Sequence, residues 1–134
     1  MYKKILILLF IFLPVSINSY ANDKSTGLRI GSADAKVTIK VFSSLTCPAC
    51  AHFHEKIHKN LKEEFIDTGK VRFEHHAFPL DLAALNAEKI LRCVKNSEKS
   101  FQFLSEIYKK QNKWAVGSDI NKINESLKKI GLNF

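Results

Sequence analysis

The sequence has little of what marks a fibrous or low-complexity protein. Its 134 residues contain only five glycines, three prolines and three cysteines, and they show no internal repeat and no low-complexity tract. What is present, 46% hydrophobic and 25% charged residues, is ordinary for a globular protein. The length predicts a single domain.

The sequence also lacks an apolar run long enough to cross a bilayer. Its longest apolar stretch, residues 5–15, has 11 residues, whereas a membrane-spanning helix needs roughly 20. Two lysines precede this stretch, and Ser19 and Ala21 follow it at the spacing of a cleavage site. This is the three-part pattern of a secretory signal peptide over residues 1–21. We therefore expect export with cleavage after Ala21, and no lipoprotein anchor, because no cysteine follows closely.

Acidic residues are too few to balance the basic ones. The net charge is +8, and the loss of Lys3 and Lys4 with the signal peptide lowers it to +6. A basic excess can indicate nucleic-acid binding, but an exported protein rarely meets nucleic acid, and the lysines are scattered over the predicted helices. We interpret them as a solvated surface that favours acidic partners or an anionic membrane surface.

The first half of the mature chain predicts a strand, a helix and a second strand. Residues 37–42 and 71–78 each alternate between two faces, and the first run is rich in β-branched side chains, as is typical of strands. Two strands separated by one helix should lie parallel, with a right-handed crossover. This part of the chain therefore belongs to the α/β class.

The helix between these strands should begin near Cys47, because Pro48 suits a first helical turn, where its missing N–H costs nothing. Gly69 follows the last turn and predicts a left-handed residue at the C-terminal end. An apolar stripe should form the buried face of the helix. Its members recur at every fourth position: Phe53, Ile57, Leu61 and Phe65.

The second half of the chain is predicted to be helical. Asp81 can cap a helix over residues 82–95, and a second helix covers residues 98–111. Ser118 or Asp119 can cap a third helix, which runs almost to the end of the chain.

Cys47 and Cys50 form a Cys-Pro-Ala-Cys motif where the first strand passes into the helix. The thiolate is the nucleophilic form of cysteine, and a helix N-terminus stabilises negative charge. Cys47 should therefore have a lowered pKa, be the more exposed thiol and react first. Cys50 lies one turn further along and should resolve the mixed disulfide by closing the bond to Cys47. This spacing and placement predict thiol–disulfide exchange.

Two other interpretations of the pair stay open. One is a static disulfide, although two intervening residues at a helix start make a strained structural bridge. The other is a metal site, since nearby histidines add nitrogen ligands suitable for Zn²⁺. There is no second Cys-x-x-Cys, and copper sites with the Cys-x-x-x-Cys spacing need one more residue. We therefore expect no bound metal.

The histidines and the third cysteine need separate interpretation. His52 is the best histidine candidate for stabilising the Cys47 thiolate, although a histidine at such a position is more often a surface residue. His75 and His76 are consecutive in a strand, so one should be buried and hydrogen-bonded and the other solvated. Cys93 is left over after the pair, and we interpret it as a buried thiol on a helix.

Four stretches together resemble the DsbA-like branch of the thioredoxin-fold proteins. Residues 31–39 look like the family's entry into its first core strand, and residues 42–50 look like its active-site loop with the Cys-Pro-x-Cys form. Residues 78–81, Phe-Pro-Leu-Asp, look like the end of its second strand. The Ala- and Leu-rich helix that follows looks like the start of its inserted helical domain.

The resemblance implies a thioredoxin-like α/β fold in three parts after the signal peptide. These are an N-terminal segment over residues 22–36, a strand–helix–strand unit over residues 37–79, and an incomplete helical insertion over residues 80–134. By the same resemblance Cys47 is the nucleophile and Cys50 the resolving thiol. No cofactor is implied beyond the redox-active disulfide itself.

The resemblance also implies where and with what the protein works. It implies disulfide formation in exported proteins of the bacterial periplasm, with reoxidation by a quinone-linked membrane oxidase. Pro48 and Ala49 would form the dipeptide that tunes the potential. The strongest oxidants of the family carry His at the position of Ala49. We therefore expect a weaker oxidant, but one more oxidising than thioredoxin at about −270 mV.

The chain departs from the family pattern in ways that matter. Val41 stands where members often bury an acidic residue that moves the proton of the resolving thiol. The family's final strands, last helix and cis-proline loop are not recognisable, since the prolines are Pro14, Pro48 and Pro79. Cys93 has no partner cysteine in this sequence, and a partner could lie in the part of the family fold that is not recognisable here. We expect an N-terminal portion of a larger fold, with strands exposed along their edges.

Three hypotheses about function follow. The leading one is an oxidoreductase that introduces disulfides into exported proteins. A second is a disulfide isomerase or reductase that uses the same site. The third, from a different class, is a metal-binding module or an inactive fragment.

Overall fold

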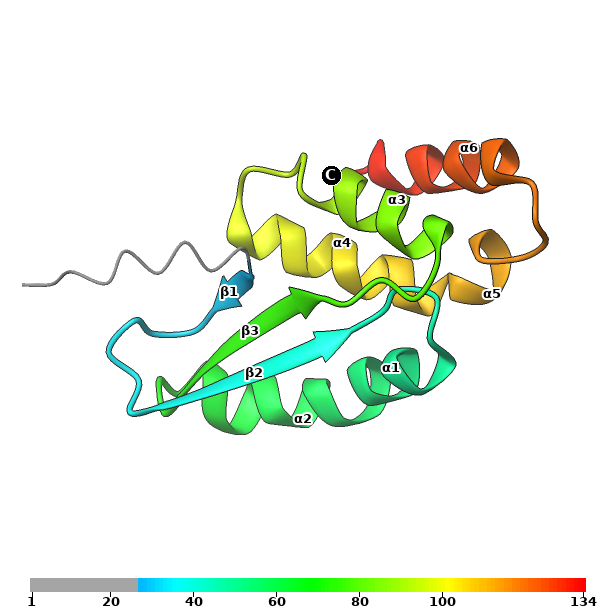
Figure 1. Cartoon of the computed structure of the whole chain (residues 1–134). Coiled ribbons are helices and arrows are strands. Elements are labelled where there is room, and N and C mark those ends of the chain that lie inside the picture. The colour runs from blue at the N-terminus through cyan, green and yellow to red at the C-terminus, as the bar shows by residue number, and fades with distance from the viewer. Residues whose placement is uncertain (1–26) are drawn as a thin grey trace, which may run out of the picture.

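The computed structural model describes residues 27–134. The predicted signal peptide and the first residues of the predicted N-terminal segment lie outside the described residues. Within the described part, the strands form one sheet at the centre of the molecule, with helices on two opposite sides of it (Figure 1).

The sheet is mixed and has the strand order β1-β3-β2. β2 (Val37–Ser43) runs parallel to β3 (Val71–Ala77), with Val37 opposite Val71, which confirms the predicted parallel pair. β1 (Leu28–Ile30) pairs antiparallel with the other side of β3. The sequence did not predict β1, because so short a strand cannot show an alternating pattern.

β2 lies at one edge of this sheet, and β1 lies at the other. Two of its apolar side chains, Val37 and Phe42, are 53% and 64% exposed. The expectation that the two parallel strands are exposed along both edges therefore holds for β2 but not for β3, whose other edge is paired with β1.

One helical stretch connects β2 to β3, and its turns alternate between α-helical and π-helical geometry. Its segments are α1 (Pro48–His52), η1 (Phe53–His58), α2 (Lys59–Leu61) and η2 (Lys62–Ile66). Gly69 follows with a φ of 75°. The predicted extent of the helix and its left-handed terminal glycine are therefore confirmed.

The predicted buried stripe of this helix is wrong at two of its four positions, since only Phe53 and Leu61 pack against the core. Ile57 and Phe65 are 53% and 39% exposed, whereas His54 and His58, one position further along than predicted members of the stripe, are buried. His58 packs its ring edge-on against Phe73, with 4.6 Å between the ring centroids. A neutral imidazole fills a core as an aromatic ring does, but hydrophobicity counts it as polar. The sequence pattern therefore missed the two histidines of the buried face.

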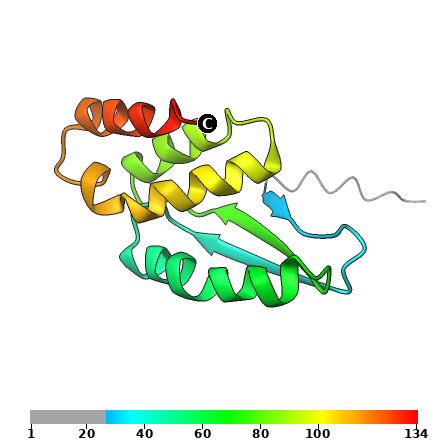
Figure 2. The ribbon, with the colours of Figure 1, turned by 180° about the vertical axis from the view of Figure 1, so that it is seen from behind.

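The second half of the described chain is helical, as predicted. Its helices are α3 (Leu82–Leu91), α4 (Ser97–Lys109), α5 (Gln111–Trp114) and α6 (Ile120–Gly131). In the views from the front and from behind, they lie across the strands from the α1–η2 helix (Figures 1 and 2). α3 ends at Leu91, about one turn earlier than predicted, and the short helix α5 was not predicted.

Two predicted helix caps are present. Asp81 accepts the N–H of Ala84 at 2.7 Å at the start of α3, and Asp119 accepts the N–H of Asn121 at 3.0 Å at the start of α6. The large side chains that are fully buried include Phe73 of β3 and Trp114 of α5. The core therefore joins the sheet to the helical half. Within residues 27–134, no helix is long and apolar enough to span a membrane.

Candidate active site

Cys47 lies at the N-cap of α1, at the end of the loop that leaves β2. Its backbone is extended (φ −79°, ψ 119°), and its sulfur accepts the backbone N–H of Cys50 at 3.4 Å. Pro48 occupies the first helical turn, as predicted. Pro48 and Ala49 are exposed between the two cysteines, which are both partly exposed and unbridged in this structure.

The two thiols differ in acidity because their surroundings differ. A hydrogen bond from the Cys50 side chain, followed by the backbone N–H groups of Cys50 and Ala49, lowers the pKa of Cys47. Burial raises the pKa of Cys50, and its hydrogen bond to Cys47 raises it further. The thiolate therefore forms on Cys47, and the proton stays on Cys50. This is the direction that the predicted roles require, and the roles themselves stay predictions.

The loop before Cys47 is held by side chains that are distant in sequence. Gln111 of α5 donates from Nε2 to the carbonyl oxygens of Leu45, at 2.8 Å, and of Cys47, at 3.1 Å. Sequence reasoning missed Gln111, since it lies far along the chain from the loop and no local pattern marks it. These two bonds fix the direction from which the chain enters α1.

Asp81 also accepts a second hydrogen bond, which the sequence did not predict. Its Oδ1 caps α3, while its Oδ2 accepts the hydroxyl of Thr46 at 2.6 Å. Ser44 adds to this contact, because its hydroxyl lies 3.1 Å from that of Thr46 and accepts the N–H of Leu80 at 3.4 Å. The start of the helical half is thereby tied to the active-site loop.

His52, the histidine predicted as a candidate for stabilising the thiolate, is exposed on the last turn of α1. Among the described residues, no hydrogen bond or ring contact joins it to Cys47 or Cys50. The groups that lower the pKa of Cys47 come instead from Cys50 and Ala49 of α1.

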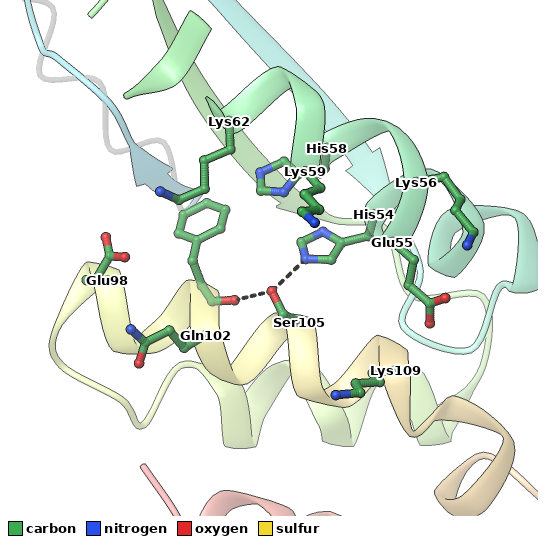
Figure 3. Close-up of a pocket in the computed structure, with 11 residues that line it drawn as sticks. His54, Glu55, Lys56, His58, Lys59, Lys62, Glu98, Gln102, Ser105 and Lys109 are labelled. Carbon is green, nitrogen blue, oxygen red and sulfur yellow. Dashed lines mark hydrogen bonds between the residues drawn. The ribbon is translucent and has the colours of Figure 1, made fainter. Parts of the chain in front are cut away.

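His54 and His58 are buried between the helix and α4. Their rings stack with 4.5 Å between centroids. Ser105 gives its hydroxyl proton to the carbonyl of Phe101, so His54 donates from Nε2 to the Ser105 oxygen at 2.9 Å (Figure 3). Burial lowers the pKa of His54 to about 3 and that of His58 to about 4. Both imidazoles are therefore neutral near pH 7.

These two histidines also line a hollow of about 520 Å³ between the helix and α4. Lys59 and Lys62 approach it from the helix, and Gln102 and Ser105 approach it from α4 (Figure 3). Neither active-site thiol is among the described residues that line it. The histidine pair therefore belongs to the packing of α4 against the helix.

His75 is buried and hydrogen-bonded, which confirms one half of the prediction for the His75–His76 pair. It lies 3.1 Å from the hydroxyl of Ser43 and 2.7 Å from a carboxylate oxygen of Glu88. His76 is less exposed than predicted. Its side chain is 13% exposed, bonds to Glu74 at 2.9 Å and stacks on Phe42.

The prediction that Cys93 is a buried thiol is wrong. Because α3 ends at Leu91, Cys93 lies beyond it, is exposed and donates weakly to the carbonyl of Lys89 at 3.4 Å. As for metal ligands, no group of three or more His, Cys, Asp or Glu side chains between residues 27 and 134 is placed to hold an ion.

Comparison with known proteins gives several matches. A family model described as thioredoxin matches residues 23–131. A Rickettsia bellii protein named as a putative protein-disulfide oxidoreductase is 34% identical over 102 residues, which are 76% of this chain and 38% of that protein. Disulfide bond formation protein D of Bacillus subtilis is 27% identical over 110 residues, which are 75% of this chain and 49% of that protein.

The fold has solved counterparts. The crystal structure of Wolbachia pipientis alpha-DsbA1 matches with a TM-score of 0.72 and 28% identity, covering 81% of this chain and 53% of that one. This confirms the predicted thioredoxin-like α/β fold with a helical insertion. The chain spans about half or less of the length of the proteins it matches. On these grounds the chain belongs to the thioredoxin family, in its DsbA-like branch.

Proposed function

We propose that Cys47 and Cys50 form the dithiol–disulfide couple of a protein-disulfide oxidoreductase. One observation carries the proposal: the Cys47 sulfur lies at a helix N-terminus and accepts the Cys50 N–H, while burial keeps the proton on Cys50. Two cysteines in a static bridge have no need of such an asymmetry. In an exchange reaction it decides which sulfur leaves and which sulfur attacks.

In the oxidising direction, a substrate thiolate attacks the Cys47 sulfur of the Cys47–Cys50 disulfide. The bond to Cys50 breaks, and Cys50 leaves as a thiolate that takes up a proton because its pKa is raised. A second substrate thiolate then attacks the substrate sulfur of the mixed disulfide. Cys47 leaves as the thiolate that the first turn of α1 stabilises. The substrate gains a disulfide, and the enzyme is left as the dithiol.

The same asymmetry favours the oxidase over the isomerase or reductase. A thiolate that is stabilised in the reduced protein makes the disulfide the less stable form, which raises the reduction potential. Because Ala49 offers no imidazole to the thiolate, we place the potential between about −120 and −230 mV, the range spanned by DsbA, disulfide isomerase and glutaredoxins.

A glutathione redox titration tests this proposal. The purified chain carries Cys93→Ser, which removes the exposed third thiol. It is equilibrated over a range of ratios of reduced to oxidised glutathione and alkylated, and its mass is measured by mass spectrometry. We expect one two-electron transition in the stated range, absent in Cys47→Ser. A chain that shows no defined transition, or one typical of an unstructured peptide, contradicts the proposal.

We further propose that the protein acts in the periplasm on exported proteins with cysteine thiols and is reoxidised by a quinone-linked membrane oxidase. The signal-peptide pattern of residues 1–21 and the resemblance to DsbA-like proteins support the location. Expression of the full chain in a bacterial host should yield, in the periplasmic extract, a product that starts at Asn22. Recovery of the uncleaved chain from the cytosol alone contradicts this.

A further inference from the structure

A buried chain of polar side chains lies beneath the active-site loop. Tyr108 of α4 donates its hydroxyl to Ser43 at 3.1 Å, and the Ser43 hydroxyl lies 3.1 Å from Nδ1 of His75. Nε2 of His75 lies 2.7 Å from Glu88 of α3. Each of the four residues is at most 6% exposed. Residues of β2, β3, α3 and α4 therefore meet in one chain of hydrogen bonds.

The hydrogen bonds of this chain run in one direction. The Ser43 oxygen accepts from Tyr108, so its own proton is free for Nδ1 of His75. His75 then carries its proton on Nε2 and donates it to the Glu88 carboxylate. Ser43 is thus held from two sides, by a donor from α4 and by an acceptor from β3.

Ser43 is the last residue of β2, and the backbone of the next residue, Ser44, acts on both cysteines. The Ser44 carbonyl accepts the Cys47 N–H at 3.1 Å. The Ser44 backbone also lowers the pKa of the Cys50 thiol, against the effect of burial. Burial raises the pKa of Tyr108, and charge on either cysteine sulfur raises it too.

We propose that Ser43 is a positioning residue for the Cys47–Cys50 couple, because Tyr108 and His75 hold its side chain and thereby fix the adjoining Ser44 backbone, whose carbonyl accepts the Cys47 N–H. This inference rests on the proposed function. Ser43 would thus influence the pKa of the resolving thiol, Cys50, although it lies outside the Cys-Pro-Ala-Cys motif and is uncharged.

The test is a pH titration of the reduced, otherwise complete chain, with carbon-13 at the cysteine β-carbons so that NMR reports each thiol separately. The variants are Ser43→Ala, which removes both bonds, and Tyr108→Phe, which removes one. Ser100→Ala is the matched control, because Ser100 is 1% exposed and its hydroxyl bonds only to carbonyls near the start of α4. All three are made in the Cys93→Ser background.

We expect Ser43→Ala to raise the pKa of Cys50 by up to about one unit, which makes its thiolate up to about tenfold scarcer at a pH well below that pKa. Tyr108→Phe should raise the pKa of Cys50 by a smaller amount. If Ser43→Ala does not fold, the result for Tyr108→Phe tests the inference alone. Ser100→Ala should leave it unchanged. Unchanged Cys50 titration in both site variants, or an equal shift in the control, overturns the inference. Failure of the proposed function would show separately, as the absence of a redox transition in the parent chain.

Discussion

Replacing Gln111 with leucine tests how far the active-site loop depends on the helical half. The substitution keeps the size of the side chain and removes the amide that bonds to the carbonyls of Leu45 and Cys47. Leu45 is fully buried, so water cannot readily replace its lost donor, whereas Cys47 is partly exposed. A net hydrogen bond is worth about 0.5–1.5 kcal/mol, and an orphaned buried acceptor costs about 1–3 kcal/mol.

We therefore expect Gln111→Leu to lower the free energy of unfolding by about 1–3 kcal/mol, measured by urea denaturation of the reduced chain. In a domain of roughly this size each kcal/mol lowers Tm by about 4–8 °C. Gln102→Leu is the control, because Gln102 is exposed on α4 and makes no hydrogen bond within residues 27–134. A loss smaller than that of one ordinary hydrogen bond, or a loss matched by the control, would refute the argument that Gln111 holds the loop.

Three further predictions follow from the site and its surroundings. Iodoacetamide at pH 6–7 should alkylate Cys47 before Cys50, since the two pKa values are displaced in opposite directions; equal rates by mass spectrometry contradict this. The pKa of His58 is about 4 in the folded chain and about 6.5 in the unfolded chain. The unfolded state therefore binds more protons between pH 6.5 and pH 4, and the free energy of unfolding decreases as the pH falls through this range. His58→Phe should flatten that fall in urea unfolding, and an unchanged slope would show that the histidine is not buried. Asp81→Ala should cost about 1–3 kcal/mol, because it removes a helix cap and the Thr46 bond, whereas Thr46→Val should cost less; equal losses in thermal unfolding would count against the cap.

The sequence predicted the parts of this fold that depend on neighbours in the chain. The two parallel strands, the helix that begins after Cys47 and the caps Asp81 and Asp119 are local patterns with direct physical causes, and each is present. β1 was missed because it is fixed by pairing with β3, a contact between distant parts of the chain. Local patterns carry no information about such a pairing.

The buried face of the helix shows a different limit of sequence reasoning. His54 and His58 behave as aromatic core residues once burial has lowered their pKa values and kept them neutral. That protonation state is a consequence of the fold, so a scale based on the free amino acid cannot contain it. The exposed Ile57 and the buried His58 are adjacent, and only the tertiary structure exchanges their expected roles.

The division of the chain into a redox unit and a helical insertion describes its topology better than its chemistry. The acidity of Cys47 is local, since it arises from Cys50 and Ala49 in the first turn of α1. The position of the loop that presents Cys47 is not local, because Gln111, Asp81 and Tyr108 hold it, and all three come from residues 80–134. A shorter chain could keep the whole Cys-Pro-Ala-Cys motif and still lose every one of these contacts. The helical half is therefore part of the site, and changes made there should alter the redox couple without touching either cysteine.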